Sequence, residues 1–171
     1  MGIIQNRLVI CGEHEIERFK DSGINHIVSV SNPGGTASIP NWFHGDRLEL
    51  QFGDVISEAD AASLGTEPPT VDDVRKAIDF FSRAWSSGSK GILIHCNYGA
   101  SCSPALAFVG LAHQLGPGQQ HEALQAILKI RPVAVPNLLV VELPDAILDR
   151  GGGLMAPLKK LYADIEAELN Q

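Results

Sequence analysis

Cys96 stands at the start of a short loop whose composition suits the binding of an anion. Residues 91–95 (GILIH) are typical of a buried strand, and the loop 96–102 (CNYGASC) leads into Ser103-Pro104, which suits the first turn of a helix. Consecutive backbone N–H groups in such a strand–loop–helix connection can converge on one anion, and the helix N-terminus adds its dipole. Gly99 allows the backbone to bend inward. We therefore predict a loop that binds phosphate.

The same electrostatic field would act on the thiol of Cys96. Backbone dipoles that favour a bound anion also favour the thiolate over the thiol. A thiolate beside a bound phosphate is a nucleophile aimed at phosphorus. The alternative is a structural thiol, because free cysteines are often buried in protein cores. Cys96 is therefore a candidate nucleophile.

Strands and helices alternate through the first half of the chain, and helices fill the second half. This pattern predicts an α/β fold with a central, mainly parallel sheet of about four to five strands flanked by helices on both faces. Apolar runs predict strands at 7–11, 26–30, 48–52 and 91–95, and helical spacing or caps predict helices at 13–22, 70–87, 103–115, 119–130, 138–148 and 154–169. The strand at 48–52 alternates apolar and polar residues, which favours a place near an edge. Residues 53–69 are expected to form a long connection.

Four polar or thiol side chains fall at or just after the ends of the predicted strands. They are Cys11, Ser31, Asp54 and Cys96. In parallel α/β sheets, ligands bind beyond the carboxyl ends of the strands. We therefore expect these side chains to lie close together.

Length, net charge and cysteine count exclude several classes of protein. The 171 residues suit one domain, residues 1–171, and the formal net charge of −7 disfavours nucleic acid and anionic membranes as partners. No apolar run reaches the roughly 18 residues of a membrane span. Three cysteines, an odd number without Cys-x-x-Cys spacing, disfavour both a disulfide framework and a metal site. We expect a cytoplasmic protein with reduced thiols, no metal and no cofactor.

The segment from His95 to Ser103 resembles the signature of the cysteine-dependent protein tyrosine and dual-specificity phosphatases. That signature has His-Cys, five residues, an arginine, and then serine or threonine, and here His95, Cys96, Gly99 and Ser103 match it in register. The similarity extends over about residues 7–145 and is greatest to the small bacterial predicted tyrosine phosphatases. It implies a phosphotyrosine phosphatase-like fold with Cys96 as the nucleophile. The phosphate-binding loop would be formed by Asn97, Tyr98, Gly99, Ala100, Ser101 and Cys102.

The resemblance also suggests roles for residues around the loop. Asp54 would be the general acid, although an aspartate after glycine is also common in turns. Ser103 would partner the Cys96 thiolate, or cap the helix. Asn137, in the segment Arg131-Pro132…Pro136-Asn137, would brace the loop or cap the next helix, and His95 would orient the loop through hydrogen bonds. Tyr98 would be either a pocket wall or a packed ring.

Cys102 stands where the signature has its arginine. A thiol cannot reproduce the planar, bidentate grip of a guanidinium on phosphate. Losing one oxyanion donor costs roughly 10²–10³ in rate, and an arginine that stabilises phosphoryl transfer contributes roughly 10³–10⁵. Arg131 could supply a substitute cation or form a surface pair. We predict a phosphatase-like protein, impaired in catalysis, that binds a phosphate group, free or on a protein or small molecule.

Two alternatives stay open at this point. The chain could be an active phosphomonoester hydrolase that passes through a phosphocysteine on Cys96, with Asp54 protonating the leaving group. It could instead be a redox-responsive protein in which Cys96 and Cys102 form a disulfide, which requires Cα atoms within about 7 Å. Cys11 is a second candidate for the resolving thiol in that case.

Overall fold

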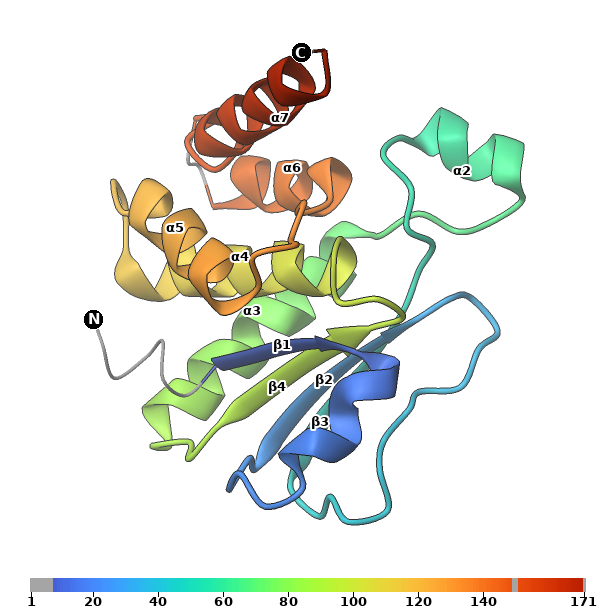
Figure 1. The fold of residues 1–171 in the computed structure, drawn as a ribbon, viewed down its shortest axis with the longest axis vertical. Helices are drawn as coiled ribbons and strands as arrows, with labels where there is room; N and C mark the ends of the chain where they lie inside the picture. The colour runs from blue at the N-terminus through green and yellow to red at the C-terminus, as the bar shows by residue number, and fades with distance from the viewer. Residues whose placement is uncertain (1–7, 149–150, 171) are drawn as a thin grey trace.

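A computed structural model describes residues 8–148 and 151–170 of the chain (Figure 1). Its centre is a four-stranded parallel sheet in the order β1-β4-β2-β3. The strands are β1 (Leu8–Gly12), β2 (His26–Ser31), β3 (Asp46–Gln51) and β4 (Ile92–Cys96). The predicted α/β class with a parallel sheet is confirmed, and the third strand lies at an edge as expected. Arg7, the first residue of the first predicted strand, lies outside the described residues.

Five helices cover one face of the sheet and enclose the main hydrophobic core (Figure 1). α4 is buried continuously from Cys102 to Ala112, which places the helix that follows β4 in the middle of this layer. The Thr70–Asp73 capping box begins α3 as the sequence predicts. The five helices are α3 (Val71–Ser86), α4 (Cys102–Leu115), α5 (Gln120–Ile130), α6 (Leu138–Ile147) and α7 (Met155–Leu169).

The opposite face is covered differently from the prediction. A short 3-10 helix, η1 (Glu13–Phe19), and the connection 32–45 lie there in place of an α-helix at 13–22. Ile16 is the one buried residue of η1, so this segment lacks the apolar stripe that would hold a longer helix against the sheet. A smaller core of Cys11, Ile16, Ile27, Phe43 and Leu93 fills the space beneath it.

The connection 53–69 contains a helix that the sequence did not predict. α2 (Glu58–Leu64) begins after Ser57, whose Oγ accepts a hydrogen bond from the Asp60 amide, and it ends at Gly65 in the left-handed conformation. Ala61 is its only buried residue, which explains why no helical periodicity was visible.

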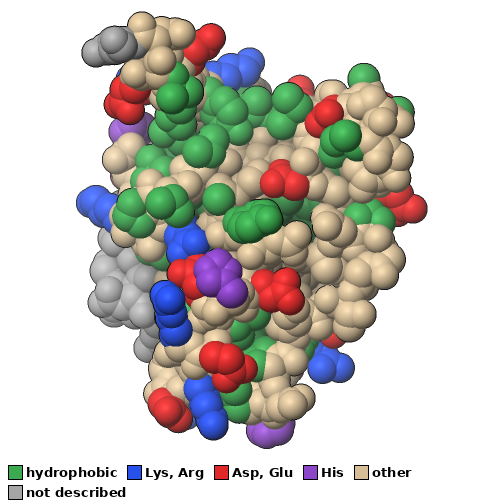
Figure 2. Space-filling view, turned by 45° about the vertical axis from the view of Figure 1, so that its right-hand side comes forward, with side chains coloured by type: hydrophobic (Ala, Val, Ile, Leu, Met, Phe, Trp, Pro, Cys, Tyr) green, Lys and Arg blue, Asp and Glu red, His purple; other side chains and the backbone are tan. Residues whose placement is uncertain are grey.

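The outer surface of α6 and α7 is partly apolar. Figure 2 shows hydrophobic side chains gathered over this upper part of the molecule. They border a groove of about 700 Å³ whose apolar lining includes Ile56, Leu138, Met155, Tyr162 and Leu169. Among the described helices, none combines the length and apolar character needed to cross a membrane.

Candidate functional site

The loop between β4 and α4, residues 96–103, is here called the Cys96 loop. Five consecutive carbonyl groups of this loop accept hydrogen bonds from the chain around it. In a trans peptide the C=O and the following N–H point in opposite directions. With these carbonyls turned outward, the amides of residues 98–102 therefore face the inside of the loop. The donors to carbonyls 97 to 101 are, in order, Glu13 N (3.1 Å), Arg131 Nη2 (2.9 Å), Arg131 Nε (3.2 Å), Val135 N (2.8 Å) and Asn137 N (3.2 Å).

Gly99 is the point at which the loop touches β1. Its φ of +67° lies in the left-handed region, which favours glycine. A Cβ at this position would lie 2.6 Å from the Gly12 nitrogen and closer still to the Cys11 carbonyl group. The sharp turn expected at Gly99 is thus combined with a backbone contact that leaves no room for a side chain.

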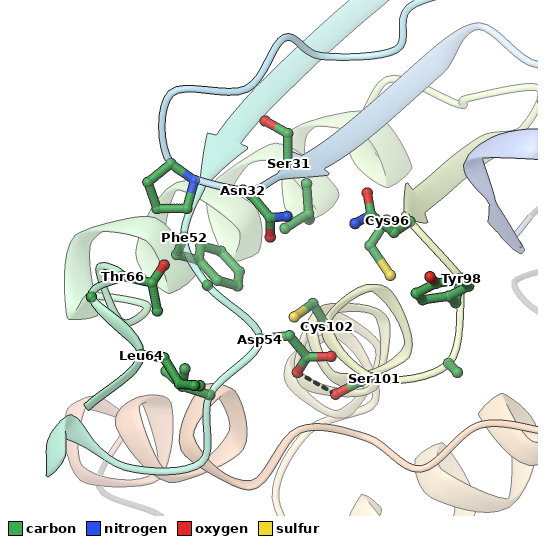
Figure 3. A pocket seen from close by; sticks show the side chains of 17 residues that line it. Ser31, Asn32, Phe52, Asp54, Leu64, Thr66, Cys96, Tyr98, Ser101 and Cys102 are labelled. Atoms are coloured by element: carbon green, nitrogen blue, oxygen red, sulfur yellow. Dashed lines mark hydrogen bonds between the residues drawn. The ribbon is translucent and has the colours of Figure 1, made fainter. Parts of the chain in front are cut away.

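A cavity of about 520 Å³ opens in front of the Cys96 loop (Figure 3). One side of it is formed by the loop residues, with Cys96 and Cys102 both facing the cavity. Tyr98 is 77% exposed, so it borders the cavity as an open wall and not as a packed ring. No lysine, arginine or histidine is among the described residues that line the cavity. The opposite wall includes Val30, Pro33, Phe52, Asp54, Val55 and Leu64.

Cys96 is half-buried at the end of β4, and its Sγ lies 3.3 Å from the Ser103 Oγ. Ser103 is the second residue of α4 and is fully buried. Because it lies within the helix, its hydroxyl is not an N-cap. Either atom can be the donor of this hydrogen bond, so the buried Ser103 hydroxyl is the polar partner of the Cys96 thiol.

Cys102 is the first residue of α4 and is 3% exposed. Burial raises the pKa of the Cys102 thiol, and the Asp54 carboxylate beside it raises the pKa further. The side chain is therefore a neutral thiol at physiological pH. The inner side of the loop has neither the charge nor the forked donors of a guanidinium at this position.

Asp54 lines the cavity and is hydrogen-bonded to Asn137, which is buried and does not line it. The Asp54 Oδ1 accepts hydrogen bonds from the Ser101 Oγ at 2.7 Å and the Asn137 Nδ2 at 2.8 Å. Asn137 also caps α6, because its Oδ1 accepts from the Val140 amide at 3.0 Å. Asn137 therefore combines the two roles considered for it, helix cap and contact with the loop. Its backbone N–H donates to the Ser101 carbonyl, and its side chain donates to Asp54, which is itself bonded to Ser101.

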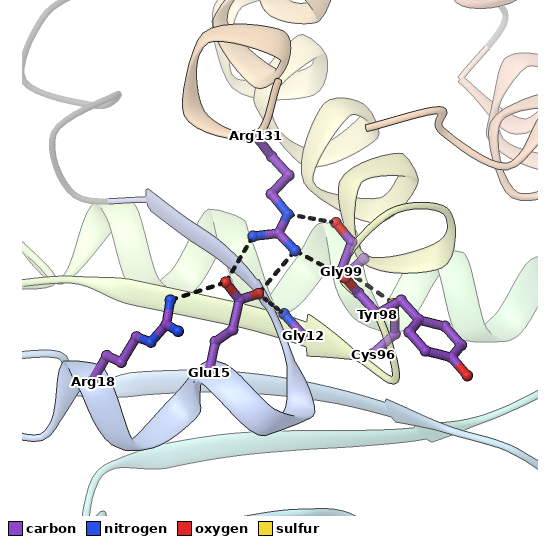
Figure 4. A network of polar contacts seen from close by, with 8 residues as sticks. Gly12, Glu15, Arg18, Cys96, Tyr98, Gly99 and Arg131 are labelled. Carbon is purple, nitrogen blue, oxygen red and sulfur yellow. Dashed lines mark hydrogen bonds and ion pairs between the residues drawn. The ribbon is translucent and has the colours of Figure 1, made fainter. Parts of the chain in front are cut away.

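Arg131 lies behind the Cys96 loop and not in the cavity (Figure 4). Its guanidinium donates to the Tyr98 and Gly99 carbonyls and pairs with Glu15 at 2.8 Å. The hydrogen bonds from Arg131 and from the Gly12 amide hold the pKa of Glu15 below its usual range. Arg131 thus supports the loop from outside, and it does not act as a substitute cation in the cavity.

His95 is only 2% exposed, and its side chain lies on the η1 face of the sheet. The hydrogen bonds expected to orient the loop are not found, because neither ring nitrogen has a partner among the described residues. Burial lowers the pKa of His95 to about 4, so the imidazole is neutral at physiological pH.

Comparison with solved structures places the fold among known phosphatases. Human DUSP28 is 17% identical with a TM-score of 0.60, and the match covers 95% of this chain and 96% of that one. A mouse putative dual specificity phosphatase complexed with zinc tungstate is 22% identical with a TM-score of 0.59, over 95% and 86% of the two chains. The human tyrosine phosphatase-like serine/threonine/tyrosine-interacting protein is 16% identical with a TM-score of 0.60, over 84% and 91%. This chain has a tyrosine and dual-specificity phosphatase fold. No family model matches the sequence, and no curated protein matches it either.

Within this phosphatase fold, the sequence did not point to Glu15 or to the apolar cavity wall. Glu15 lies three residues after Gly12, and its carboxylate accepts a hydrogen bond from the Gly12 amide at 2.8 Å. That spacing was a local signal of a capped turn, but its pairing with Arg131 spans 116 positions of the chain. Phe52 and Leu64 carried no signal of a role in the cavity, because apolar residues in these positions suit a core equally well.

Proposed function

We propose that this protein binds a phosphate group, free or carried by a protein or small molecule, in the Cys96 loop and turns it over slowly or not at all. The observation that carries this proposal is the outward orientation of five consecutive loop carbonyls. The amides that face inward as a result form a concave set of donors, which suits a tetrahedral oxyanion. The dipole of α4, which starts at Cys102, adds to the attraction.

The expectation of impaired turnover rests on what the inner side of the loop lacks. Amides can hold a phosphate, but the charge that develops during phosphoryl transfer needs a cation or a strong additional donor. A buried neutral thiol occupies that position, and the described cavity residues include no cation. Asp54 supports the same view, because it accepts two hydrogen bonds as a carboxylate that holds the loop in place.

The fold similarity is compatible with a binding role. One similar structure is described as a phosphatase-like, interacting protein, and another is complexed with zinc tungstate. Tungstate is a tetrahedral oxyanion of the same shape as phosphate, so it is a suitable probe for the Cys96 loop.

The test combines binding with turnover. Calorimetric titration with tungstate and with inorganic phosphate should show one site in the wild type, and p-nitrophenyl phosphate should be hydrolysed weakly or not at all. Cys102→Arg should raise hydrolysis by roughly 10²-fold or more, whereas the matched variant Cys102→Ser should not, because only the first restores a cation. Strong hydrolysis by the wild type that Cys96→Ser abolishes would instead identify an active phosphomonoester hydrolase. No binding of either oxyanion by the folded wild type would reject the proposal.

A second candidate function is a thiol redox response. The observation in its favour is that the Cys96 and Cys102 side chains face the same cavity (Figure 3). Cys11 is a weaker candidate for the resolving thiol, because it belongs to the core on the η1 face and does not line this cavity. Burial raises the pKa of Cys11 as it does that of Cys102, so the two thiols are distinguished by their location and not by their ionisation.

A further inference from the structure

A second, smaller cavity of about 130 Å³ lies on the η1 face of the sheet beside the main one. We call it the serine–histidine cavity, because Ser29, Ser31 and His95 contribute its buried polar lining. Four residues line both cavities, namely Val30, Ser31, Asn32 and Asn97. The two spaces are therefore neighbours, and Asn97 of the Cys96 loop borders both of them.

The polar groups of this cavity lack partners. The hydroxyl oxygens of Ser29 and Ser31 and both ring nitrogens of His95 are buried with no hydrogen bond to any described residue. Ser29 and His95 are opposite each other in the register of β2 and β4, and they are 1% and 2% exposed. An unsatisfied buried polar group costs about 1–3 kcal/mol, and proteins rarely leave several together. Their cluster indicates a site for a hydrogen-bonding ligand.

The chemistry of the lining selects the class of ligand. The serine hydroxyls are uncharged, and the His95 imidazole is neutral because burial lowers its pKa to about 4. Each of these side chains can both donate and accept a hydrogen bond. An ammonium group only donates and a carboxylate only accepts, so either would leave part of the lining unsatisfied. Glu13, whose carboxylate accepts from Ser38 at the same cavity, would also repel an anion. A hydroxyl group matches the lining best, because it donates and accepts as well.

We infer that the ligand of the main cavity is a phosphorylated polyol whose hydroxyl groups hydrogen-bond in the serine–histidine cavity. The inference rests on the proposed binding of phosphate by the Cys96 loop. The volume of the cavity equals that of about four water molecules, at roughly 30 Å³ each, which is room for a short hydroxylated chain. Ser29, which lines the smaller cavity and not the main one, would thus determine specificity without touching the phosphate.

The experiment compares two phosphate monoesters of the same length. Glycerol 3-phosphate carries hydroxyls and propyl phosphate does not, so calorimetric titration of both isolates the contribution of the hydroxyls. The wild type should bind glycerol 3-phosphate about tenfold more tightly, and Ser29→Ala should remove most of that difference while leaving propyl phosphate binding unchanged. Ser86→Ala, an exposed serine at the end of α3, is the matched control and should preserve the difference.

A second measurement does not depend on a variant. In the nuclear magnetic resonance spectrum of the wild type, the ring signals of His95 should shift with glycerol 3-phosphate more than with propyl phosphate. Equal affinities for the two esters would show that the cavity holds water only, and this would overturn the inference while the proposed function stands. A preference that survives Ser29→Ala, without a response of His95, would place the hydroxyls elsewhere and also overturn it. Failure of both esters to bind would overturn the inference, and it would reject the proposed function as well if tungstate and inorganic phosphate also failed to bind.

Discussion

Arg131 and Glu15 form a nearly buried pair directly behind the Cys96 loop, with Nη2 and Oε2 2.8 Å apart. The same guanidinium donates to two loop carbonyls, so one arginine connects the end of α5, η1 and the loop. Its forked geometry, which would suit a phosphate, is used on backbone and carboxylate oxygens instead. The loop is thus held in shape by an arginine outside it, while the inside has none among the described residues.

Removing this arginine should destabilise the protein and loosen the loop. Arg131→Ala breaks an ion pair whose side chains are 19% and 14% exposed and leaves two carbonyls without donors. We expect a loss of about 2–4 kcal/mol in the free energy of unfolding, measured by urea denaturation. Arg18→Ala is the control, because Arg18 contacts the same Glu15 but is 71% exposed, and it should cost less than about 0.5 kcal/mol. Equal effects of the two variants would contradict this account.

Gly99 should tolerate no side chain. Gly99→Ala combines a left-handed φ with overlap against the Cys11 and Gly12 backbone, so we expect a loss of about 3 kcal/mol or more and loss of tungstate binding. Gly88→Ala separates the two effects, because Gly88 has a φ of +73° and open space around it. Gly88→Ala should lower the free energy of unfolding by only about 1 kcal/mol. Denaturation of both variants and titration with tungstate would measure this, and a mild effect at Gly99 would argue against the tight contact with β1.

The two roles of Asn137 can be separated by substitution. Asn137→Ala should cost about 2–4 kcal/mol, because it removes the cap of α6 and the bonds to Asp54 and the Val55 carbonyl. Asn137→Ser should restore about 1 kcal/mol of this loss by capping α6 again, without bracing Asp54. Tungstate binding should be weakened in both variants. Full recovery of binding in the serine variant would show that the brace is dispensable.

The free energy of unfolding should decrease as the pH falls, because His95 is protonated more readily in the unfolded chain than in the folded protein. Its folded pKa of about 4 lies below the value of about 6.5 expected in the unfolded chain, so the unfolded state takes up the proton first. The contribution is therefore fully present above about pH 7 and is lost as the pH falls toward 4, with a loss of about 2 kcal/mol between pH 7 and pH 5. Burial also lowers the pKa of His26, which adds to the same slope.

Denaturation at several pH values would measure this slope. His95→Gln should reduce it substantially, because glutamine does not titrate, and the contribution of His26 would remain. His44→Gln, at an exposed position, should leave the slope as it is in the wild type. A slope that is unchanged in His95→Gln would show that the imidazole is not buried in its neutral form.

The redox candidate predicts one specific disulfide. Hydrogen peroxide would oxidise the Cys96 thiolate to a sulfenic acid with release of water, and the Cys102 thiol would then displace a second water to form the disulfide. The intact mass should fall by two hydrogen atoms, and peptide mapping should link the two cysteines. Cys96→Ser and Cys102→Ser should each prevent this change, whereas Cys11→Ser should not, since Cys11 lies in the core on the η1 face. An unchanged mass, or a disulfide to Cys11, would contradict the candidate.

Much of the scaffold was visible in the sequence, because strands, caps and helices leave local patterns. Residues 91–95 predicted β4, the Thr70–Asp73 box predicted the start of α3, and the alternation of LELQF placed β3 at an edge. The sequence did not predict α2, and it predicted a longer helix in place of η1, since each of these elements buries a single residue. A pattern of apolar spacing needs a buried face to produce it, and these short elements have almost none.

The sequence by itself predicted the strand–loop–helix around Cys96 and showed a cysteine, Cys102, and no arginine in the loop, because both features lie within a few adjacent residues. Only the tertiary structure decided what surrounds the loop. Arg131 meets Glu15 across 116 positions, Asn137 meets Asp54 across 83, and His95 faces a cavity formed with β2 and the connection that follows it. These partners depend on how the connections cross the sheet and on which face each side chain occupies, and distant contacts of this kind leave no local periodicity to be read.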